Sequence, residues 1–336
     1  MILDSGVPEV APLPKCPACG EANLETADHI VDLAKVLDRW EEFGIRFSAE
    51  TRTKYTTQGS RFVSLLHCPV CTFGTFDPPL AGDQDFYEAI ETTEYYTPRK
   101  WEFDLAIKDL RAFGAQHVID VGCGSGHFLR ELRRAEPGMR LAGNDLSGSQ
   151  VNRLAEEGFE VYEGPPVVIK DRAAAFDAVC SFQTLEHLSD PFEGLRALRD
   201  LVRPGGILIV TTPDTAGPIQ HYRDSHTAIP PHHVTLWSER AFRAALPRYG
   251  FAVEIVRIEP LEHYLWDFYV GPQWRDGIWP AHVFGPLGQR INLGHPDQQR
   301  QLAIDTLRRL GERRLEGVPG HTVYVLARRT DDHSAS

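Results

Sequence analysis

A glycine-rich turn near the middle of the chain limits the possible folds more than any other stretch. Residues 118–129 read V-I-D-V-G-C-G-S-G-H-F-L. The first four include three β-branched apolar side chains, which is typical of a buried parallel strand. The three glycines let the backbone turn sharply and approach a ligand closely, and the amides of a following helix attract a negatively charged group. The stretch therefore predicts a strand, a ligand-binding turn and a helix.

An acidic residue follows at a spacing that suits a nucleotide. Asp145 ends the next apolar run, 23 residues after Gly122, where a carboxylate can accept hydrogen bonds from both hydroxyls of a ribose. The NAD fingerprint G-x-G-x-x-G has glycine at its sixth position, but here that position is His127 and glycine is at the fifth. We therefore favour a nucleotide-type ligand over a purely structural turn, and we do not favour NAD.

Length and charge narrow the class of protein. A chain of 336 residues can form one large domain and a smaller one. Its formal net charge of −12 argues against nucleic acid as a partner, because a phosphate backbone attracts basic surfaces. The sequence has no apolar run long enough to cross a bilayer and does not start like a signal peptide. We expect a cytoplasmic protein that does not associate with membranes.

Four of the six cysteines form two C-x-x-C pairs. Cys16 and Cys19 make the first pair, and Cys68 and Cys71 make the second after 48 intervening residues. Two such pairs can hold one zinc ion in a closed, structural site. A redox pair or buried free thiols are the alternatives, but a redox C-x-x-C does not need a second copy. We predict an N-terminal zinc-binding module over residues 1–85.

The spacer between the cysteine pairs has its own predicted structure. Asp28 suits the N-cap of a helix that ends near Phe43. Residues 61–66 read as a strand that leads to the second cysteine pair. The apolar face of the helix is predicted to consist of Ile30, Leu33, Leu37 and Trp40.

After the module, strands and helices alternate, which predicts a parallel sheet covered by helices on both faces. Ligands of such sheets bind beyond the carboxyl ends of the strands. Three strand ends carry residues named above or polar residues next to them. We expect these residues to converge on one pocket. They are Gly122 and Gly124 after the first strand, Asp145 after the second, and Phe182 and Gln183 after the fourth.

Two further runs make a family resemblance specific. Residues 176–191 read F-D-A-V-C-S-F-Q-T-L-E-H-L-S-D-P, and residues 201–206 read L-V-R-P-G-G. With D-V-G-C-G-S-G at 120–126, they resemble the motifs of class I S-adenosylmethionine (SAM) methyltransferases of the ubiquinone-biosynthesis type and of the related type 11, 12 and 23 groups. The resemblance covers most of residues 86–260. It implies an α/β, Rossmann-like, seven-stranded sheet whose last strand is antiparallel.

The resemblance also implies a division of the chain and a set of cofactor contacts. Residues 86–115 are expected to form linker or lid helices, and residues 116–336 the SAM-binding domain. An aromatic-rich insertion at 261–320 is expected to line the acceptor pocket, or else to pack as a dimer surface. Tyr96 and Arg99 either cover SAM and pair with its carboxylate or serve as linker packing, and Phe182 is otherwise core. The predicted cofactor-binding residues are Tyr96, Arg99, Asp120, Gly122, Gly124, Asp145, Leu146, Phe182 and Gln183.

Histidines are the candidates for catalysis. Residues 230–233 read P-P-H-H and resemble P-P-E-H of the same family, so His233 matches the family histidine and His232 replaces the acid. A neutral imidazole in a loop after a strand suits a general base, although it can also pin the loop through backbone hydrogen bonds. His187 is the third candidate, and with Glu186 it either positions the substrate or caps the next helix.

The neighbourhood of His187 also bears on metal binding. In ubiquinone-type O-methyltransferases an E-x-x-E-H run is associated with a divalent metal. Here Gln183 stands in place of the first acid, and the two remaining ligands make a poor magnesium site. No catalytic metal is predicted from the sequence.

The sequence therefore predicts a SAM-dependent enzyme that methylates oxygen or carbon of a small molecule, such as a sugar, a quinone or a natural-product intermediate. A homodimer is an open option. Two rival hypotheses remain. The first is an RNA methyltransferase that grips RNA with its zinc module. The second is a SAM-binding or interaction protein without catalysis.

Overall fold

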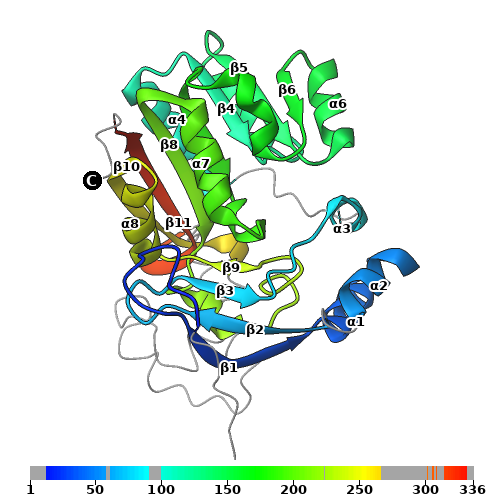
Figure 1. The fold of residues 1–336 in the computed structure, drawn as a ribbon. Helices are drawn as coiled ribbons and strands as arrows, with labels where there is room; N and C mark the ends of the chain where they lie inside the picture. The colour runs from blue at the N-terminus through cyan, green and yellow to red at the C-terminus, as the bar shows by residue number, and fades with distance from the viewer. Residues whose placement is uncertain are drawn as a thin grey trace, which may run out of the picture.

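Two β-sheets organise the molecule (Figure 1). The computed structural model describes residues 13–57, 61–90, 100–222, 224–265, 301, 305, 308 and 314–330. One sheet has seven strands and belongs to the centre and C-terminal part of the chain, and the other has four strands and belongs mostly to the N-terminal part.

The seven-stranded sheet has the predicted topology. Six of the seven strands run in one direction, and β11 is antiparallel to both of its neighbours, β8 and β10. The α/β fold with an antiparallel last strand is thereby confirmed. In spatial order the strands are β10 (Phe251–Glu262), β11 (Arg314–Arg329), β8 (Val202–Pro213), β7 (Phe176–Phe182), β4 (His117–Val121), β5 (Arg140–Asp145) and β6 (Glu160–Glu163).

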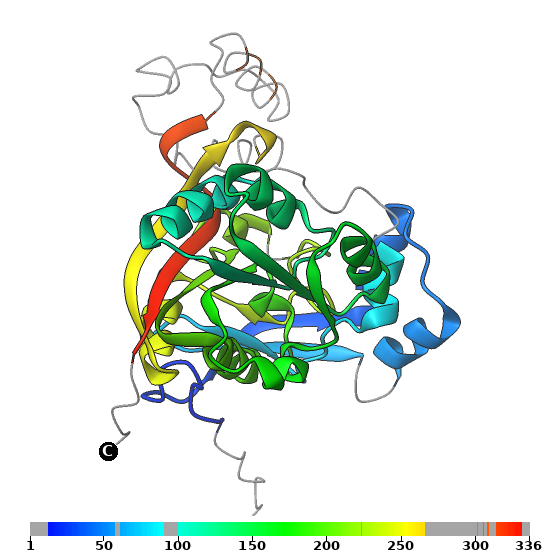
Figure 2. The same cartoon turned by 90° about the horizontal axis from the view of Figure 1, so that it is seen from above.

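Helices cover both faces of this sheet, as the continuous burial of its central strands requires. On one face the sheet packs against α4 (Trp101–Phe113), α5 (His127–Ala135) and α6 (Gly148–Glu156). On the other face it packs against α7 (Pro191–Leu201) and α8 (Glu239–Arg248). Figure 2 shows the sheet between these helices. Four 3-10 segments complete this part: η1 (Pro166–Arg172), η2 (Leu185–His187), η3 (Pro218–Tyr222) and η4 (His263–Leu265).

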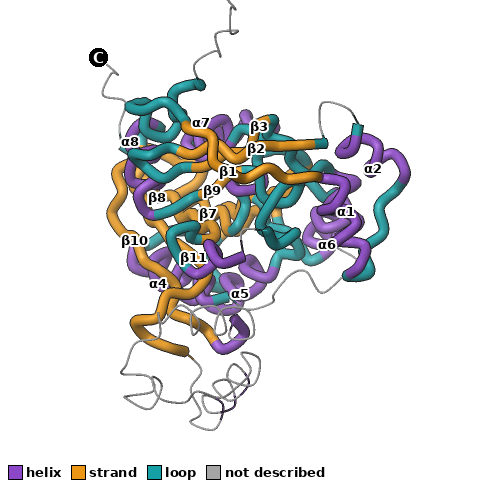
Figure 3. Tube along the Cα trace, turned by 90° about the horizontal axis from the view of Figure 1, so that it is seen from below, coloured by secondary structure: helices purple, strands orange, loops and turns teal. Residues whose placement is uncertain are grey.

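The N-terminal sheet follows the order β1-β2-β3-β9 and is antiparallel throughout. Its strands are β1 (Glu25–Asp32), β2 (Phe62–His67), β3 (Gly74–Asp77) and β9 (Thr235–Leu236), and its helices are α1 (Leu33–Glu42), α2 (Ala49–Thr56) and α3 (Gln84–Ile90). Figure 3 shows these four strands side by side. The two-residue strand β9 comes from the C-terminal half of the chain, so it ties the two parts of the protein together.

The predicted start of the first helix is wrong. Residues 25–32 form β1, and the helix begins at Leu33 with Asp32 as its N-cap, whose carboxylate accepts a hydrogen bond from the Ala34 amide at 3.1 Å. The neighbouring Ile30 and Val31 are β-branched and pair with β2, which favours a strand. Ile30 is consequently exposed, whereas the other three predicted apolar residues are buried.

The segment that carries His232 and His233 rests on the N-terminal part. The Gly82 amide donates to the Pro231 carbonyl at 2.7 Å, and the Phe76 amide donates to the Val234 carbonyl at 3.0 Å. The pairing of β3 with β9 continues this contact. The N-terminal part therefore supports one wall of the region beyond the strand ends. Within the described part of the chain, no helix has the length and apolar character needed to cross a membrane.

Candidate active site

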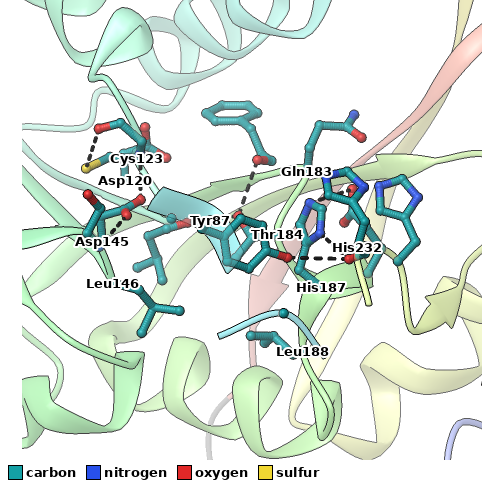
Figure 4. Close-up of a pocket in the computed structure, with 18 of the residues that line it drawn as sticks. Tyr87, Asp120, Cys123, Asp145, Leu146, Gln183, Thr184, His187, Leu188 and His232 are labelled. Carbon is teal, nitrogen blue, oxygen red and sulfur yellow. Dashed lines mark hydrogen bonds and ion pairs between the residues drawn. The ribbon is translucent and has the colours of Figure 1, made fainter. Parts of the chain in front are cut away.

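A cavity of about 780 Å³ lies beyond the carboxyl ends of β4, β5 and β7 (Figure 4). The glycine turn lines one end of it, which we call the glycine end. Three histidines, His187, His232 and His233, line the other, which we call the histidine end. Strand β4 pairs with both β5 and β7. The chain order reverses at this place, and ligands of open α/β sheets bind there.

The glycine turn needs its glycines. Gly122, Gly124 and Gly126 all have positive φ, at 77°, 48° and 76°, a region that other residues rarely adopt. A Cβ atom added to Gly122 would lie 2.3 Å from the side-chain oxygen of Thr184. The turn is thus packed closely against Thr184, and it lines the cavity.

Asp145 holds the turn in place. Its carboxylate accepts a hydrogen bond from the Gly124 amide at 2.7 Å and another from the Ser147 amide at 2.9 Å. Each carboxylate oxygen has a second lone-pair site, so the side chain can accept from a ligand as well. Asp145, which the sequence predicts to bind a ribose, therefore lies at the cavity and is already oriented by the protein.

Asp120 is buried at the end of β4 and also lines the cavity. One of its carboxylate oxygens, Oδ1, has no hydrogen-bond partner among the described residues. Burial first, and then the negative charge of Asp145, raise the pKa of Asp120 to about 8. A neutral carboxyl at this place can donate a hydrogen bond, which Asp145 in its ionised form cannot.

Three imidazoles meet at the histidine end. The ring centroids of His187 and His232 are 4.6 Å apart, those of His187 and His233 4.9 Å, and those of His232 and His233 4.5 Å. Burial lowers the pKa of His187 to about 4 and those of His232 and His233 well below their usual range. For His232 and His233 the neighbouring histidines add to this effect. All three rings are neutral near pH 7.

Backbone carbonyls fix the tautomers of two of these rings. His187 Nδ1 lies 2.7 Å from the His232 carbonyl oxygen, and His232 Nδ1 lies 2.8 Å from the Thr227 carbonyl oxygen. A carbonyl only accepts, so both Nδ1 atoms carry hydrogen and both Nε2 atoms carry a lone pair. In Figure 4, His187 and Tyr87 both point to the His232 backbone oxygen.

Glu186 also lines the cavity, next to His187 in the chain. It is 2% exposed, and neither carboxylate oxygen accepts a hydrogen bond from the described residues. Its Oε1 lies 3.9 Å from His187 Nε2. Burial raises the pKa of Glu186 to about 8. An unpaired buried carboxyl is costly, so this position favours a ligand that the protein alone does not supply.

Residues 97–256 match the family described as a methyltransferase domain. This match covers both the glycine turn and the histidine-bearing segments. The chain contains a class I SAM-dependent methyltransferase domain.

Curated relatives agree with this methyltransferase assignment. A ubiquinone biosynthesis O-methyltransferase of Ruegeria pomeroyi is 32% identical over 117 residues, which are 33% of this chain and 46% of that protein. The enzyme of the same name from Chromobacterium violaceum is 37% identical over 108 residues, 30% of this chain and 46% of that protein. The chain thus spans about half the length of the curated relatives it matches.

Among solved structures, a SAM-dependent methyltransferase from Archaeoglobus fulgidus is 20% identical to this chain, with a TM-score of 0.44. The alignment covers 73% of this chain and all of that one.

Most of the predicted cofactor residues of the methyltransferase domain come together. Asp120, Gly122, Gly124, Asp145, Leu146, Phe182 and Gln183 all line the cavity. Phe182 packs against Phe103 and Phe128, with ring centroids 5.2 and 4.6 Å away. The side-chain amide of Gln183 donates to the Thr322 hydroxyl at 3.3 Å. Tyr96, Arg99 and most of the insertion at 261–320 lie outside the described residues.

Sequence reasoning missed several polar residues of the methyltransferase cavity, among them the buried Glu102 and Glu259 and the half-buried His321. Glu259 accepts hydrogen bonds from the His321 and Thr322 amides, both at 3.1 Å. Burial lowers the pKa of His321 to about 4. These residues lie on α4, β10 and β11, far apart in the chain and outside any motif, so no local signal indicates them.

The four paired cysteines form a separate buried cluster beside the methyltransferase domain. The Sγ atoms of Cys16 and Cys71 are 3.6 Å apart, as are those of Cys19 and Cys68, and all four thiols are free. The four Sγ atoms lie within 4.8 Å of one another. The cluster packs into the same apolar core as α7 and α8, and Arg248 of α8 donates to the Cys19 carbonyl at 3.0 Å.

Proposed function

We propose that the protein transfers the methyl group of SAM to an oxygen or carbon atom of a small-molecule acceptor. One observation carries the proposal. A single cavity joins the glycine turn and Asp145, which suit the cofactor, to a buried group of neutral histidines, which suits an acceptor. The names of the curated relatives, which are O-methyltransferases of ubiquinone biosynthesis, support an acceptor of this kind.

In the proposed complex the ribose hydroxyls of SAM donate to Asp145, and the glycine turn approaches the methionine part. The sulfonium methyl then faces the histidine end. The acceptor O–H or C–H loses its proton, its electron pair attacks the methyl carbon in line, and the C–S bond breaks. The products are the methylated acceptor, S-adenosylhomocysteine (SAH) and one proton. Most of the rate enhancement in such a step comes from alignment.

The histidine end suits removal of the acceptor proton. Its imidazoles are neutral near pH 7, and the Nε2 atoms of His187 and His232 carry lone pairs. His187, His232 and His233 are therefore the residues that we assign to this end of the reaction, as acceptors of the proton or as groups that bind the acceptor. A cavity with buried carboxyls, on a chain of net charge −12, favours a small molecule over RNA.

The cysteine cluster is assigned to a structural zinc ion. A tetrahedral site with Zn–S bonds of about 2.3 Å places its sulfur atoms about 3.8 Å apart, close to the 3.6 Å of the two measured pairs. A disulfide would need about 2.05 Å. Because the four thiolates fill all coordination positions of the ion, it cannot bind a substrate. Its role is to hold the two cysteine pairs together.

Calorimetric titration tests the cofactor assignment. The full chain should bind SAM and SAH and should not bind NAD. Asp145→Asn should weaken SAM binding about 10–100-fold, because it removes a charged acceptor of ribose hydrogen bonds. The matched control is Asp171→Asn, which neutralises an exposed carboxylate outside the cavity. Failure of the unmodified protein to bind SAM would overturn the proposal.

Catalysis needs a second experiment. The protein is incubated with SAM labelled in its methyl group and with a panel of hydroxylated and keto small molecules. Label should pass to at least one acceptor class and not to RNA. Transfer of label only to RNA would instead support the rival hypothesis of an RNA methyltransferase. SAM binding without transfer to any acceptor would favour the non-catalytic hypothesis.

A further inference from the structure

We infer that the histidine end of the cavity binds a divalent transition-metal ion through His187, His232 and His233, with Glu186 beside them. Each histidine offers one ring nitrogen, and these three atoms lie within 4.8 Å of one another. The three rings line the same cavity. This set of imidazoles differs from the E-x-x-E-H pattern, whose first acid this chain lacks.

The two segments that supply the ligands are locked together before any ion binds. The His187 ring donates to the His232 carbonyl at 2.7 Å, and the Val234 amide donates to the Glu186 carbonyl at 2.8 Å. The Thr235 hydroxyl adds a bond of 3.1 Å to the Leu185 carbonyl. Ligands on such fixed segments are preorganised, which a metal site requires.

The hydrogen bonds of the rings are those of metal-binding histidines. A ligating imidazole usually donates its second N–H to a carbonyl or a carboxylate, which fixes the tautomer and aims the other nitrogen. His187 and His232 both do this, through carbonyl oxygens of His232 and Thr227. Their Nε2 atoms are therefore the ligating atoms. A histidine that only pins a loop does not need two neighbours of the same kind.

Glu186 is the independent second observation. Its side chain is 2% exposed, it lines the cavity, and neither of its carboxylate oxygens has a hydrogen-bond partner in the part of the chain that the structure describes. A cation near His187 Nε2, which lies 3.9 Å from Glu186 Oε1, would supply the missing partner. Buried charges in proteins are normally paired or bound to metals.

The ligand types indicate the class of metal. Three imidazoles and one carboxylate suit Zn²⁺, Fe²⁺, Co²⁺ or Ni²⁺, whereas Mg²⁺ and Ca²⁺ prefer oxygen ligands. These residues hold the ion from one side, so coordination positions on its other side remain open to an oxygen atom of the acceptor. Coordination lowers the pKa of a bound hydroxyl, which serves the methyl transfer proposed above. The acceptor is then a molecule with a metal-binding oxygen, such as a catechol or a hydroxyketone.

Cobalt titration of the full chain tests the site. The protein first receives one equivalent of Zn²⁺, which the four thiolates take in preference, and Co²⁺ is then followed by its visible absorption. We expect saturation at one further equivalent, without the absorption of a cobalt–sulfur bond. Loss of a second-shell partner already weakens metal binding about 10–100-fold, so His232→Ala and His233→Ala should each weaken Co²⁺ binding by about 100-fold or more.

Two variants complete the design. Glu186→Gln keeps the shape of the side chain and should weaken Co²⁺ binding about 10-fold or more. The matched control is His127→Gln, which removes an imidazole that lines the same cavity but lies outside the cluster and should leave Co²⁺ binding unchanged. SAM titration of each variant shows that the glycine end is still folded.

Absence of saturable Co²⁺ binding beyond the zinc-filled thiolates would overturn the inference, as would unchanged binding in His233→Ala. The titration needs neither SAM nor an acceptor. Its failure therefore leaves the proposed methyl transfer standing, and failure of SAM binding leaves the metal site standing.

Discussion

At the glycine end of the cavity, Asp145 already has two amide partners from the protein, whereas at the histidine end Glu186 has none. The first carboxylate orients a loop, and the second lies desolvated among three histidines. Both lie in the same cavity. The difference separates an end that is complete before its ligand arrives from an end whose buried carboxyl accepts no hydrogen bond within the described residues.

The two ends also differ in how the chain builds them. The glycine end comes from one contiguous stretch and the strand next to it, β4 and β5. The histidine end combines η2 with the segment at 232–236, which rests on the N-terminal sheet. Stability of the glycine end should therefore depend on the central sheet, and that of the histidine end on the N-terminal part as well.

Removal of the proposed zinc ion should have the largest effect. It tests whether the stability of the histidine end depends on the N-terminal part. Structural zinc contributes on the order of 10 kcal/mol in small modules, so Cys68→Ser should unfold much of the N-terminal sheet. Hydrogen exchange should then accelerate in β2, β3 and residues 232–236, while β4 and β5 stay protected. SAM affinity should change by less than about threefold, since separate sites act almost independently.

The matched control is Val70→Ala, which lies in the same C-x-x-C turn but is not a ligand and should keep full protection. Equal loss of protection at both ends of the cavity would contradict the separation. Hydrogen-exchange rates in Cys68→Ser that equal those of the unmodified protein would also contradict the separation.

Gly122→Ala should have the next largest effect, confined to the glycine end. The new Cβ meets the Thr184 hydroxyl at 2.3 Å, and φ is 77°. The left-handed backbone alone costs about 1–2 kcal/mol for a residue with a Cβ atom. We expect SAM affinity to fall about 100-fold, measured by calorimetry, with Co²⁺ binding at the histidine end retained.

Gly138→Ala is the control for that prediction, because Gly138 has open space around it and no positive φ. It should bind SAM like the unmodified protein. If Gly122→Ala also binds SAM within about threefold of the unmodified protein, the close packing of the turn has no bearing on the cofactor.

The sequence could indicate the glycine end because its signals are local. The turn at 122–126 follows its strand directly, and Asp145 comes one strand later. The cysteine pairs carry their own spacing in the same way. The histidine end could be indicated only as two separate motifs, since nothing in either one specifies that His187 and His232 share a hydrogen bond. The start of α1 was misplaced because strand and helix compete over residues 28–32.

Contacts between elements that are far apart in the chain have no local sequence signal from which they could be predicted. Strand β9 is two residues long and forms only because β3 lies beside it. Glu259 and His321 meet through the pairing of β10 with β11, across a long intervening segment. In both cases the long-range pairing decides the structure, and local propensity contributes little.

A further prediction concerns Asp120, a residue of the glycine end that resembles Glu186. Asp120 is buried, its Oδ1 lacks a partner and its pKa is raised to about 8, first by burial and then by Asp145. Between about pH 4 and pH 8 the folded protein holds a proton that the unfolded chain has released. Stability from this residue is therefore greatest below about pH 4 and falls as the pH rises to about 8, by up to about 1.4 kcal/mol per pH unit.

Asp120→Asn removes this titration and keeps the shape of the side chain. In urea unfolding of the ligand-free protein, the free energy of unfolding of the variant should gain on that of the unmodified protein as the pH rises from about 5 to about 8. Asp171→Asn, which is exposed, should show no such gain. A constant difference across this range would mean that Asp120 is ionised in the folded protein, and then only the histidine end would hold a carboxyl that awaits its partner.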